Sequence, residues 1–506
     1  MKELYNGIIV EDNFPINETQ HAIPYLDNPP KVINVSIGRQ LFVDDFLIDK
    51  TDLVIEYHKP TKYKGNPIFK PEKSWEKESC PVACPKSGGI FYDEKEKKYK
   101  MWYEASWLRH MAYAESIDGI HFERPNLDIV KGTNIILDYK GFELEKGFTD
   151  VSYLRPDSTT VFIDPDTTNN NEKYKLFLRN PDGITPAIVA TSIDGIHFDN
   201  FHITPATEDR STVFYNPFRK KWVYSIRDSW KSRARSYYEC NDFIKDRCWN
   251  DTNKIKWLST DEKDLPNPYV DSYIPDLYNV DCVGYESIMV GMFQILYGPD
   301  NITCEKRGLP KITELMPMYS RDGFHFTRPD RDTFIKASNR DGSWDRGYIQ
   351  SVGGVLIIHK DELWIYYIGF SGDETKKDKI WFENGMYCNG ATGLAILRRD
   401  GFASINGEGY LLTKSIKFID REKMFVNVDG RVTVDILDSN NKLIVSSEEI
   451  NTNSTDAMVD FKNFNLSVLN GRQIKLLFRL SGKLYSFRFA DKNNDSHGAH
   501  AAGLVE

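Results

Sequence analysis

The chain consists largely of short segments in which apolar and aromatic residues alternate and which end at Asp, Asn, Gly or Lys. The first pair runs from Gly89 to Asp93 and, after a charged turn, from Tyr99 to Tyr103. Such segments predict β-strands joined as hairpins, because alternation places one set of side chains on each face of a sheet. The pattern recurs at 161–164 with 174–178, at 213–216 with 222–226, less regularly within 287–297, and at 354–358 with 363–367.

A longer repeat is superimposed on this alternation. Ala114–Phe122 recurs as Ala190–Phe198 and as Tyr319–Phe326, with a weaker copy at Leu397–Phe402. The Asp-Gly pairs of these copies stand at 118, 194, 322 and 400, and the wide middle gap holds a degenerate unit around Asn241–Phe243. Because Asp-Gly is typical of hairpin turns, we interpret the four pairs, and the histidines that follow three of them, as structural.

Five units of about 70 residues, each with three to four antiparallel strands, predict an all-β protein built on a five-bladed β-propeller. We place the propeller at residues 76–405 and treat 1–75 as an N-terminal segment whose stretch Gln40–Ile48 closes the ring. From 406 to 490 the pattern changes to long alternating strands, which predicts a β-sandwich. The polar tail 491–506, rich in Ala and Gly, is expected to be flexible.

Composition narrows the classes of partner. Of the 506 residues, 40% are hydrophobic and 27% are charged, and the net charge is -9, so neither nucleic acid nor an acidic membrane is an expected partner. No apolar run approaches the roughly 18 residues of a membrane span. The N-terminus lacks the pattern of a secretory signal, so the chain is either intracellular or has lost a leader, and its localisation stays open.

Cysteine usage bears on cofactors and redox state. Seven cysteines are an odd count, scattered through a long chain, which predicts free thiols in a reducing compartment rather than a disulfide framework. Cys80 and Cys84 form a C-x3-C pair, but no second pair stands at the spacing of a zinc site. We therefore expect neither a metal nor a cofactor.

The candidate site follows from the propeller geometry. The first strand of every blade lines the axis, so residues that begin those strands converge on one end. Counting back seven residues from the turn that closes the first strand gives Lys86, Asp157 and Asp209 in blades one to three. In the fourth blade, Gly284–Ser287 is interpreted as the strand start, which adds Glu286 as a third carboxylate, and the fifth offers Gln350-Ser351.

Carboxylates that converge in this way are typical of glycosidic cleavage, in which one protonated and one ionised group act together. We assign Glu286 as proton donor, Asp209 as base and Asp157 as the group that tunes the acid or orients the sugar, with the first two roles exchangeable. The expected partner is an oligosaccharide or polysaccharide, and a homo-oligomer stays open. Candidate substrate-binding residues are Lys86, Glu104, Arg109, Arg155 and Arg227 for polar contacts, and Trp102, Trp107, Trp230 and Tyr285 for stacking.

This pattern resembles the five-bladed propeller glycoside hydrolases, the invertase and fructosidase group together with the arabinanase and xylosidase group. Asp209–Phe214 stands where fructosidases carry the Glu-Cys-Pro motif of the acid/base residue, and Arg155–Asp157 is similar to their Arg-Asp-Pro motif. The segments Leu41–Asp45 and Leu397–Phe402 also resemble a divergent branch of propeller proteins. The resemblance implies a glycoside hydrolase of oligo- or polysaccharides, with furanosides among the substrates to consider.

One departure from the family keeps alternatives open. Lys86 stands where the resemblance places the aspartate nucleophile of fructosidases, so their double displacement does not carry over. An inverting scheme needs only two carboxylates. A phosphorylase is an alternative, in which Lys86, Arg155 and Arg227 bind inorganic phosphate, and a non-catalytic glycan-binding propeller is another.

Overall fold

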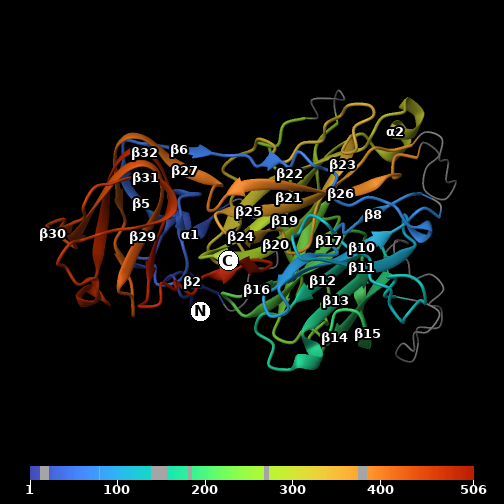
Figure 1. The fold of residues 1–506 in the computed structure, drawn as a ribbon, viewed down its shortest axis with the longest axis horizontal. Coiled ribbons are helices and arrows are strands. Elements are labelled where there is room, and N and C mark those ends of the chain that lie inside the picture. Colours follow the sequence, from blue (N-terminus) through green and yellow to red (C-terminus); the bar gives the residue numbers. More distant parts are fainter. Residues whose placement is uncertain (12–21, 79, 138–155, 180–184, 267–272, 374–384) are drawn as a thin grey trace.

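The computed structural model describes residues 1–11, 22–78, 80–137, 156–179, 185–266, 273–373 and 385–506. The chain forms two β-rich bodies side by side, a larger one at the right of Figure 1 and a smaller one at the left. Only two short α-helices occur in the described ranges, α1 (Pro24–Asp27) and α2 (Asn301–Arg307). The larger body is a five-bladed β-propeller, which confirms the predicted fold class.

The blades follow one another along the chain, each a separate antiparallel sheet. Blade I contains β8 (Ala83–Cys84), β9 (Ile90–Asp93), β10 (Lys98–Ala105) and β11 (His110–Ser116). Blade II contains β12 (Ser158–Ile163), β13 (Tyr174–Arg179), β14 (Thr185–Ser192) and β15 (Phe198–Thr207). Blade III contains β16 (Thr212–Asn216), β17 (Lys221–Asp228), β18 (Ala234–Cys240) and β19 (Ile255–Leu258). Blade IV contains β20 (Asp276–Glu286), β21 (Ile288–Gly298) and β22 (Ile312–Ser320), and blade V contains β23 (Gly347–Ser351), β24 (Ile357–His359), β25 (Glu362–Phe370) and β26 (Gly390–Arg398).

The Asp-Gly repeats are turns that close the third strands of three blades. In the first, Asp118 accepts hydrogen bonds from the backbone amides of Ile120 and His121 and contacts His121 Nδ1 at 2.7 Å. Asp194 and Asp322 make the same set of contacts with the histidines that follow them. These aspartates hold backbone turns together, as the sequence predicted.

The propeller is closed by a different N-terminal strand from the one that the sequence suggested. The two-residue strand β7 (Thr61–Lys62) pairs with β26 at the outer edge of blade V. Gln40–Leu41 instead forms β4, which pairs with a strand of the smaller body. The reason is burial, because Phe42, Phe46 and Leu47 pack into the hydrophobic core of that body.

The C-terminal tail forms two short strands that pair with the propeller, whereas its composition suggested a flexible tail. Strand β33 (Ala499–His500) pairs with β20 of blade IV, and β34 (Leu504–Val505) pairs in parallel with β24 of blade V. The amide of Tyr92 in blade I donates to the Ala502 carbonyl oxygen at 2.8 Å. The small side chains of the tail therefore permit a close backbone approach to three blades, which composition alone does not reveal.

The smaller body is sandwich-like and combines strands that precede the propeller in the sequence with strands that follow it. Its strands are β3 (Ile33–Asn34), β4, β5 (Ile48–Thr51), β6 (Val54–Tyr57), β27 (Ala403–Thr413), β28 (Ile416–Lys417), β29 (Lys423–Asp438), β30 (Leu443–Ser446), β31 (Ile450–Met458) and β32 (Ile474–Ala490), and a separate hairpin is formed by β1 (Lys2–Glu3) and β2 (Ile9–Val10). Gly430 and Gly482 face each other across β29 and β32 with positive φ angles. A Cβ atom at Gly430 would collide with the Ser481 carbonyl, so this crossing requires glycine.

One disulfide contradicts the prediction that the thiols are free. Cys80, just before β8, is bonded to Cys388, just before β26, so that blade I is tied covalently to blade V. Among the described residues, the other five cysteines are free. The two partners are 308 residues apart in sequence, and spacing could not reveal that the closed ring brings them together.

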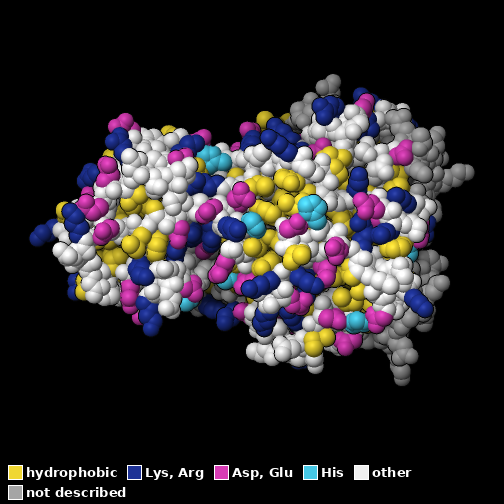
Figure 2. Space-filling model, in the orientation of Figure 1, with side chains coloured by type: hydrophobic (Ala, Val, Ile, Leu, Met, Phe, Trp, Pro, Cys, Tyr) yellow, Lys and Arg dark blue, Asp and Glu magenta, His cyan; other side chains and the backbone are white. Residues whose placement is uncertain are grey.

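The surface in Figure 2 carries Lys and Arg side chains interspersed with Asp and Glu over both bodies. The net charge of -9 is thus not gathered into one area of this face. Within the described ranges, no helix has the length and apolar character that a membrane crossing requires.

Candidate active site

The two ends of the propeller axis differ in the segments that lie there. We call the end where the innermost strands β12, β16 and β20 begin the front end, and the opposite end, which carries the tail strands β33 and β34, the rear end. Asp157 directly precedes β12, and Asp209 stands three residues before β16. Both carboxylates are therefore at the front end, as the sequence predicted.

A buried polar network crosses the axis between the two ends and joins four blades. Ser87 Oγ of blade I lies 3.2 Å from Asp281 Oδ2 of blade IV and 3.1 Å from Arg210 Nη2 of blade III. Ser351 of blade V donates to the same Asp281 oxygen at 2.5 Å, and Asn279 Nδ2 donates to it at 3.1 Å. Burial raises the pKa of Asp281, while the Ser351 hydroxyl and the Arg210 cation oppose that rise. This network fixes the blades against one another beneath the front end.

Lys86 forms a charged centre on blade I. Its Nζ atom lies 2.5 Å from Glu104 Oε2, 3.9 Å from Asp157 Oδ1 and 3.7 Å from the centroid of the Trp107 ring. Glu104, near the end of β10, also accepts a hydrogen bond from the Leu108 amide. Burial raises the pKa of Glu104 to about 7, although the Lys86 cation acts in the opposite direction. Three of the predicted residues, Lys86, Glu104 and Asp157, are thus brought together.

Asp209 forms a second centre on blade III. It makes an ion pair with Arg227, at the end of β17, and its Oδ2 lies 3.6 Å from Arg233 Nη2. Arg227 also lies 3.1 Å from Glu208 Oε2. Burial and the neighbouring Arg233 cation lower the pKa of Arg227 to about 10. The structure thus brings together Asp209 and Arg227, which the sequence had named separately, and adds Arg233, which the sequence did not indicate.

Aromatic residues link these two centres through blades IV and V. The Arg233 guanidinium stacks on the Tyr278 ring at 4.4 Å, and Tyr278 Oη lies 2.5 Å from Tyr348 Oη. Tyr348 packs on Trp107, whose ring stacks on Tyr387 with 4.4 Å between centroids and 6° between planes. Since Trp107 contacts Lys86 and Lys86 contacts Asp157, charged and aromatic residues from all five blades form a continuous path of contacts from Asp157 to Asp209. We call this set the front ring; its members are Lys86, Glu104, Trp107, Asp157, Asp209, Arg227, Arg233, Tyr278, Lys311, Tyr348 and Tyr387.

The other predicted binding residues lie in different parts of the propeller. Trp230 is half-buried in the turn after β17, with Lys256 Nζ 5.9 Å from its ring, and Arg109 lies in the turn after β10. Trp102 is fully buried and donates to the Gly195 carbonyl, so it belongs to the core. Arg155 lies outside the described residues.

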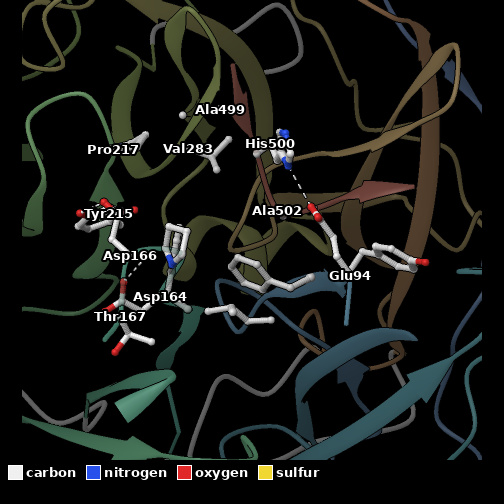
Figure 3. Close-up of a pocket in the computed structure, with 18 of the residues that line it drawn as sticks. Glu94, Asp164, Asp166, Thr167, Tyr215, Pro217, Val283, Ala499, His500 and Ala502 are labelled. Carbon is white, nitrogen blue, oxygen red and sulfur yellow. Dashed lines mark hydrogen bonds and ion pairs between the residues drawn. The ribbon is translucent and has the colours of Figure 1, made fainter. Parts of the chain in front are cut away.

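The rear end contains a cavity of about 740 Å³ that no sequence pattern indicated. Its wall combines Phe91 and Phe162 with residues 497–503 of the tail. Figure 3 shows Asp164, Asp166 and Tyr215 on one side of the cavity, and the contact between His500 and Glu94 on the other. None of the predicted site residues lines it.

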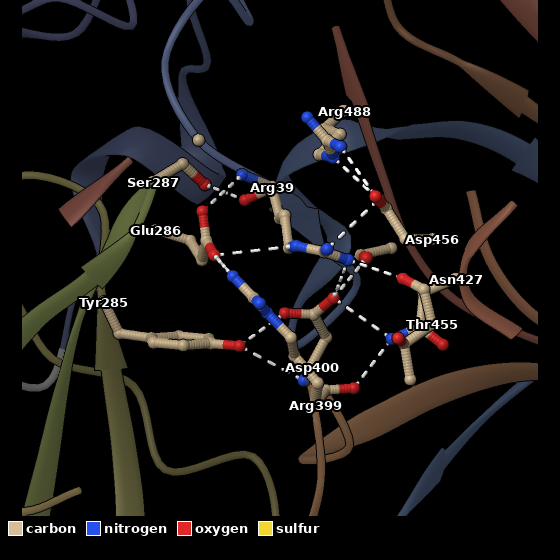
Figure 4. A network of polar contacts seen from close by, with 12 residues as sticks. Arg39, Tyr285, Glu286, Ser287, Arg399, Asp400, Asn427, Thr455, Asp456 and Arg488 are labelled. Carbon is tan, nitrogen blue, oxygen red and sulfur yellow. Dashed lines mark hydrogen bonds and ion pairs between the residues drawn. The ribbon is translucent and has the colours of Figure 1, made fainter. Parts of the chain in front are cut away.

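Glu286 does not join the other carboxylates. It ends β20 at the rear, where its Oε1 accepts from Arg399 at 2.8 Å and its Oε2 accepts from the Arg39 amide at 3.1 Å (Figure 4). The expectation failed because β20 begins at Asp276 and ends in the turn at Glu286, whereas the sequence interpretation placed the strand start there. A Cβ atom at Gly38 would lie 2.5 Å from the Glu286 carbonyl carbon, which shows how closely the N-terminal segment covers this residue.

Tyr285 belongs to the same rear network. Its hydroxyl donates to Asp400 at 2.5 Å, and Asp400 also accepts from Arg39 at 3.1 Å and from Ser486 of the smaller body at 2.6 Å. Burial would raise the pKa of Asp400, but the Arg39 and Arg399 cations outweigh it and lower the value. Tyr285 and Glu286 thus help to join the propeller to the sandwich-like body (Figure 4), and neither contacts the front ring.

The sequence missed residues of the front ring for two reasons. Counting back seven positions from the true turn at Glu286 gives Asn279, which lies in the axial network next to Tyr278. The same rule with the correct strand end would therefore have led to the right part of blade IV. Arg233 and Lys311 lie in irregular segments just before strands, and Tyr348 itself has a positive φ, so no repeat predicts their positions. In the described part of the chain, no three His, Cys, Asp or Glu side chains gather as metal ligands.

Comparison with known proteins gives only distant similarity. No protein-family model matches the chain, and no curated protein matches it. Among solved structures it is similar to an N-acetylgalactosamine deacetylase from F. plautii in complex with blood group B trisaccharide, at 13% identity and a TM-score of 0.42, over 70% of this chain and 96% of that one. It is also similar to a glycosyl hydrolase from Bacteroides ovatus, at 13% identity and a TM-score of 0.40, over 68% of this chain and 94% of that one. A β-1,2-mannobiose phosphorylase from Listeria innocua is similar at 12% identity and a TM-score of 0.41, over 68% of this chain and 96% of that one. At these scores the similarities decide nothing further, and the fold rests on the strand pairing of this chain.

Proposed function

We propose that the chain is a carbohydrate-active enzyme that hydrolyses a glycosidic bond of an oligosaccharide or polysaccharide at the front end of the propeller. The observation that carries this proposal is that Asp157 and Asp209, from neighbouring blades, belong to one connected set of charged and aromatic side chains. Glycosidic cleavage uses paired proton-transfer groups, and sugar binding uses aromatic faces and hydrogen-bonding cations. The front ring contains all of these.

The two carboxylates differ in exposure, which suggests different roles. The Asp209 side chain is 29% exposed, and it contacts the cations of Arg227 and Arg233. The Asp157 side chain is 13% exposed and lies 3.7 Å from Arg179 and 3.9 Å from Lys86. We assign Asp209 as the base that activates water and Asp157 as the residue that orients the sugar.

Phosphorolysis is a second candidate, favoured by the cations of the front ring. Within the described part of the chain, Arg227 Nε and two guanidinium nitrogens of Arg233 are buried without a hydrogen-bond partner. The mutual repulsion of these cations would be relieved by an anion, either inorganic phosphate or the carboxylate of an acidic sugar. Phosphate as the attacking group gives phosphorolysis, whereas a sugar carboxylate leaves hydrolysis as the reaction.

The test is chromatographic analysis of products from neutral and uronic oligosaccharides, incubated with the protein in the presence and absence of phosphate. We expect free sugar without phosphate, and a loss of at least about 100-fold in rate for Asp209→Asn. Asp199→Asn, at an exposed position on β15, is the matched control. A sugar phosphate formed only with phosphate would favour phosphorolysis, and glycan binding without any product would contradict both reactions in favour of a binding protein.

A further inference from the structure

Tyr278 occupies the front end of blade IV, the place for which the sequence suggested Glu286. It is the third residue of β20 and is almost completely buried. Arg235 donates one hydrogen bond to the Tyr278 carbonyl oxygen and another, of 2.6 Å, to the Arg210 carbonyl oxygen. Tyr278 is thus fixed at the start of an innermost strand, as Asp157 and Asp209 are in blades II and III.

The phenol of Tyr278 is surrounded by cations. The Arg233 guanidinium stacks on its ring at 4.4 Å, and Lys311 Nζ lies 5.2 Å from the ring centroid. Its hydroxyl contacts only the Tyr348 hydroxyl, and within the described ranges no carboxylate hydrogen-bonds to it. The charged and titratable groups around it are Arg210 before β16, Arg227 on β17, Arg233 and Arg235 at the start of β18, Lys311 before β22, Tyr348 on β23, Tyr387 before β26, and Asp276 and Asp281 on β20 itself.

These neighbouring cations set Tyr278 apart from buried tyrosines such as Tyr285 and Tyr348. Burial by itself raises a tyrosine pKa, as it does for Tyr285 and Tyr348. At Tyr278 the cations of Lys311, Arg233 and Arg210 outweigh burial and lower the pKa to about 8. The phenol therefore keeps its proton at neutral pH, while its anion is stabilised by charges already in place.

We propose that Tyr278 is the proton donor of glycosidic bond cleavage at the front end, the role that the sequence had suggested for Glu286. The proposal rests on the proposed function and deepens it. Its geometric basis is the position of Tyr278 on the front ring, where Arg233 contacts both Tyr278 and Asp209. An acid and a base are thereby held on either side of one guanidinium group.

Hydrolysis would transfer one proton from Tyr278 to the leaving oxygen and one proton from water to Asp209. The bond between the anomeric carbon and the leaving oxygen breaks, and its electron pair stays on that oxygen, which takes the proton of the Tyr278 hydroxyl. Water forms the new bond to the anomeric carbon and gives its proton to the Asp209 carboxylate. The phenolate of Tyr278 is stabilised by Lys311, Arg233 and the Tyr348 hydroxyl, and it regains a proton as Asp209 loses one to solvent.

Glu104 is less suited to this role, although its pKa also lies near neutrality. One of its oxygens contacts Lys86 Nζ at 2.5 Å and the other accepts from the Leu108 amide. Both oxygens are therefore already engaged by donors of the protein. The geometry therefore fits a positioning residue that holds Lys86 beside Asp157.

The first test measures the acidity of Tyr278 without any substrate. Ultraviolet absorbance near 295 nm reports phenolate, and the titration of the wild type is compared with that of Tyr278→Phe, which keeps the ring under Arg233. We expect the difference to correspond to one tyrosine that ionises near pH 8. Tyr410→Phe, in the sandwich-like body, is the control and should leave the absorbance change near pH 8 as it is in the wild type. A difference that develops only above pH 10 would overturn the proposal.

The second test separates proton donation from a structural role. Tyr278→Phe should slow the cleavage of an oligosaccharide at least about 100-fold and abolish the decline of kcat/KM above pH 8, because the donor is lost. It should slow the cleavage of the corresponding nitrophenyl glycoside less than about tenfold, since nitrophenolate leaves without protonation. Equal losses on both substrates, or no loss on either, would overturn the donor role. If the wild type cleaved neither substrate, the proposed function would fail together with this inference.

Discussion

The guanidinium group of Arg233 contacts both Tyr278 and Asp209, with its carbon 4.4 Å from the centroid of the Tyr278 ring and its Nη2 3.6 Å from Asp209 Oδ2. It joins blade III to blade IV at the front end. The charge of Arg233 is one of the causes that lower the pKa of Tyr278.

Replacing Arg233 by Met should raise the pKa of Tyr278 from about 8 towards the ordinary tyrosine value, because a cation that stabilises the phenolate is removed. The measurement is the same phenolate titration near 295 nm, with Arg431→Met on the exposed side of β29 as control. In an active preparation the decline of kcat/KM should move to higher pH by the same amount. An unchanged titration would mean that Arg233 does not act on Tyr278.

Replacing Lys86 by Met should lower the free energy of unfolding by about 3 kcal/mol near pH 8, because the buried Glu104 carboxylate loses its cationic partner. Urea denaturation measures the change. Glu115→Gln, which breaks the exposed pair with Lys98, is the control and should cost less than about 1 kcal/mol. Similar losses for both variants would contradict a buried ion pair.

The contribution of Glu104 to stability depends on pH with a defined sign. The pKa of Glu104 is about 7 in the folded chain, above its ordinary value of 4.5, so the folded state holds a proton more tightly than the unfolded state between these values. The wild type should therefore gain stability from this group as the pH falls from 7 to 4.5 and lose it as the pH rises. Glu104→Gln should lack this component in urea titrations at several pH values.

The disulfide between Cys80 and Cys388 predicts a thiol count. Alkylation under denaturing conditions without reductant should label five of the seven cysteines, and all seven after reduction. Reduction should also lower the midpoint of thermal unfolding, because a long loop is released in the unfolded chain. Seven labelled cysteines without reductant would contradict the pairing.

Glu286→Gln tests the rear network separately from the front end. The substitution leaves the Arg39 and Arg399 cations without their shared carboxylate, so the free energy of unfolding should fall by about 3 kcal/mol. Denaturant titration measures it, and Glu408→Gln on the exposed part of β27 is the control. A stability equal to that of the control would show that the network contributes nothing.

The propeller was predictable because its signals are local. Alternation within Gly89–Tyr103 and the Asp-Gly turn at Asp118 are properties of neighbouring residues, and the structure uses both as expected. Ring closure by Thr61–Lys62 and by the tail strands involves two-residue strands with no pattern of their own. Their pairing depends on which backbone edges the closed ring leaves available, which no local signal records.

The candidate site was partly predictable for the same reason. Lys86, Asp157 and Asp209 stand at a fixed distance from regular turns, and the structure places all three at the front end. Blade IV has an eleven-residue first strand without that turn signal, so its start was assigned to the wrong end and Tyr278 was missed. The error concerned strand length, not the geometric rule.

The most direct test of the account compares kcat/KM for Asp209→Asn and Glu286→Gln on the same oligosaccharide, with each rate divided by the folded fraction. We expect a loss of at least about 100-fold for Asp209→Asn and a rate within about twofold of the wild type for Glu286→Gln. A large loss for Glu286→Gln together with a normal rate for Asp209→Asn would contradict it and place the chemistry at the rear end.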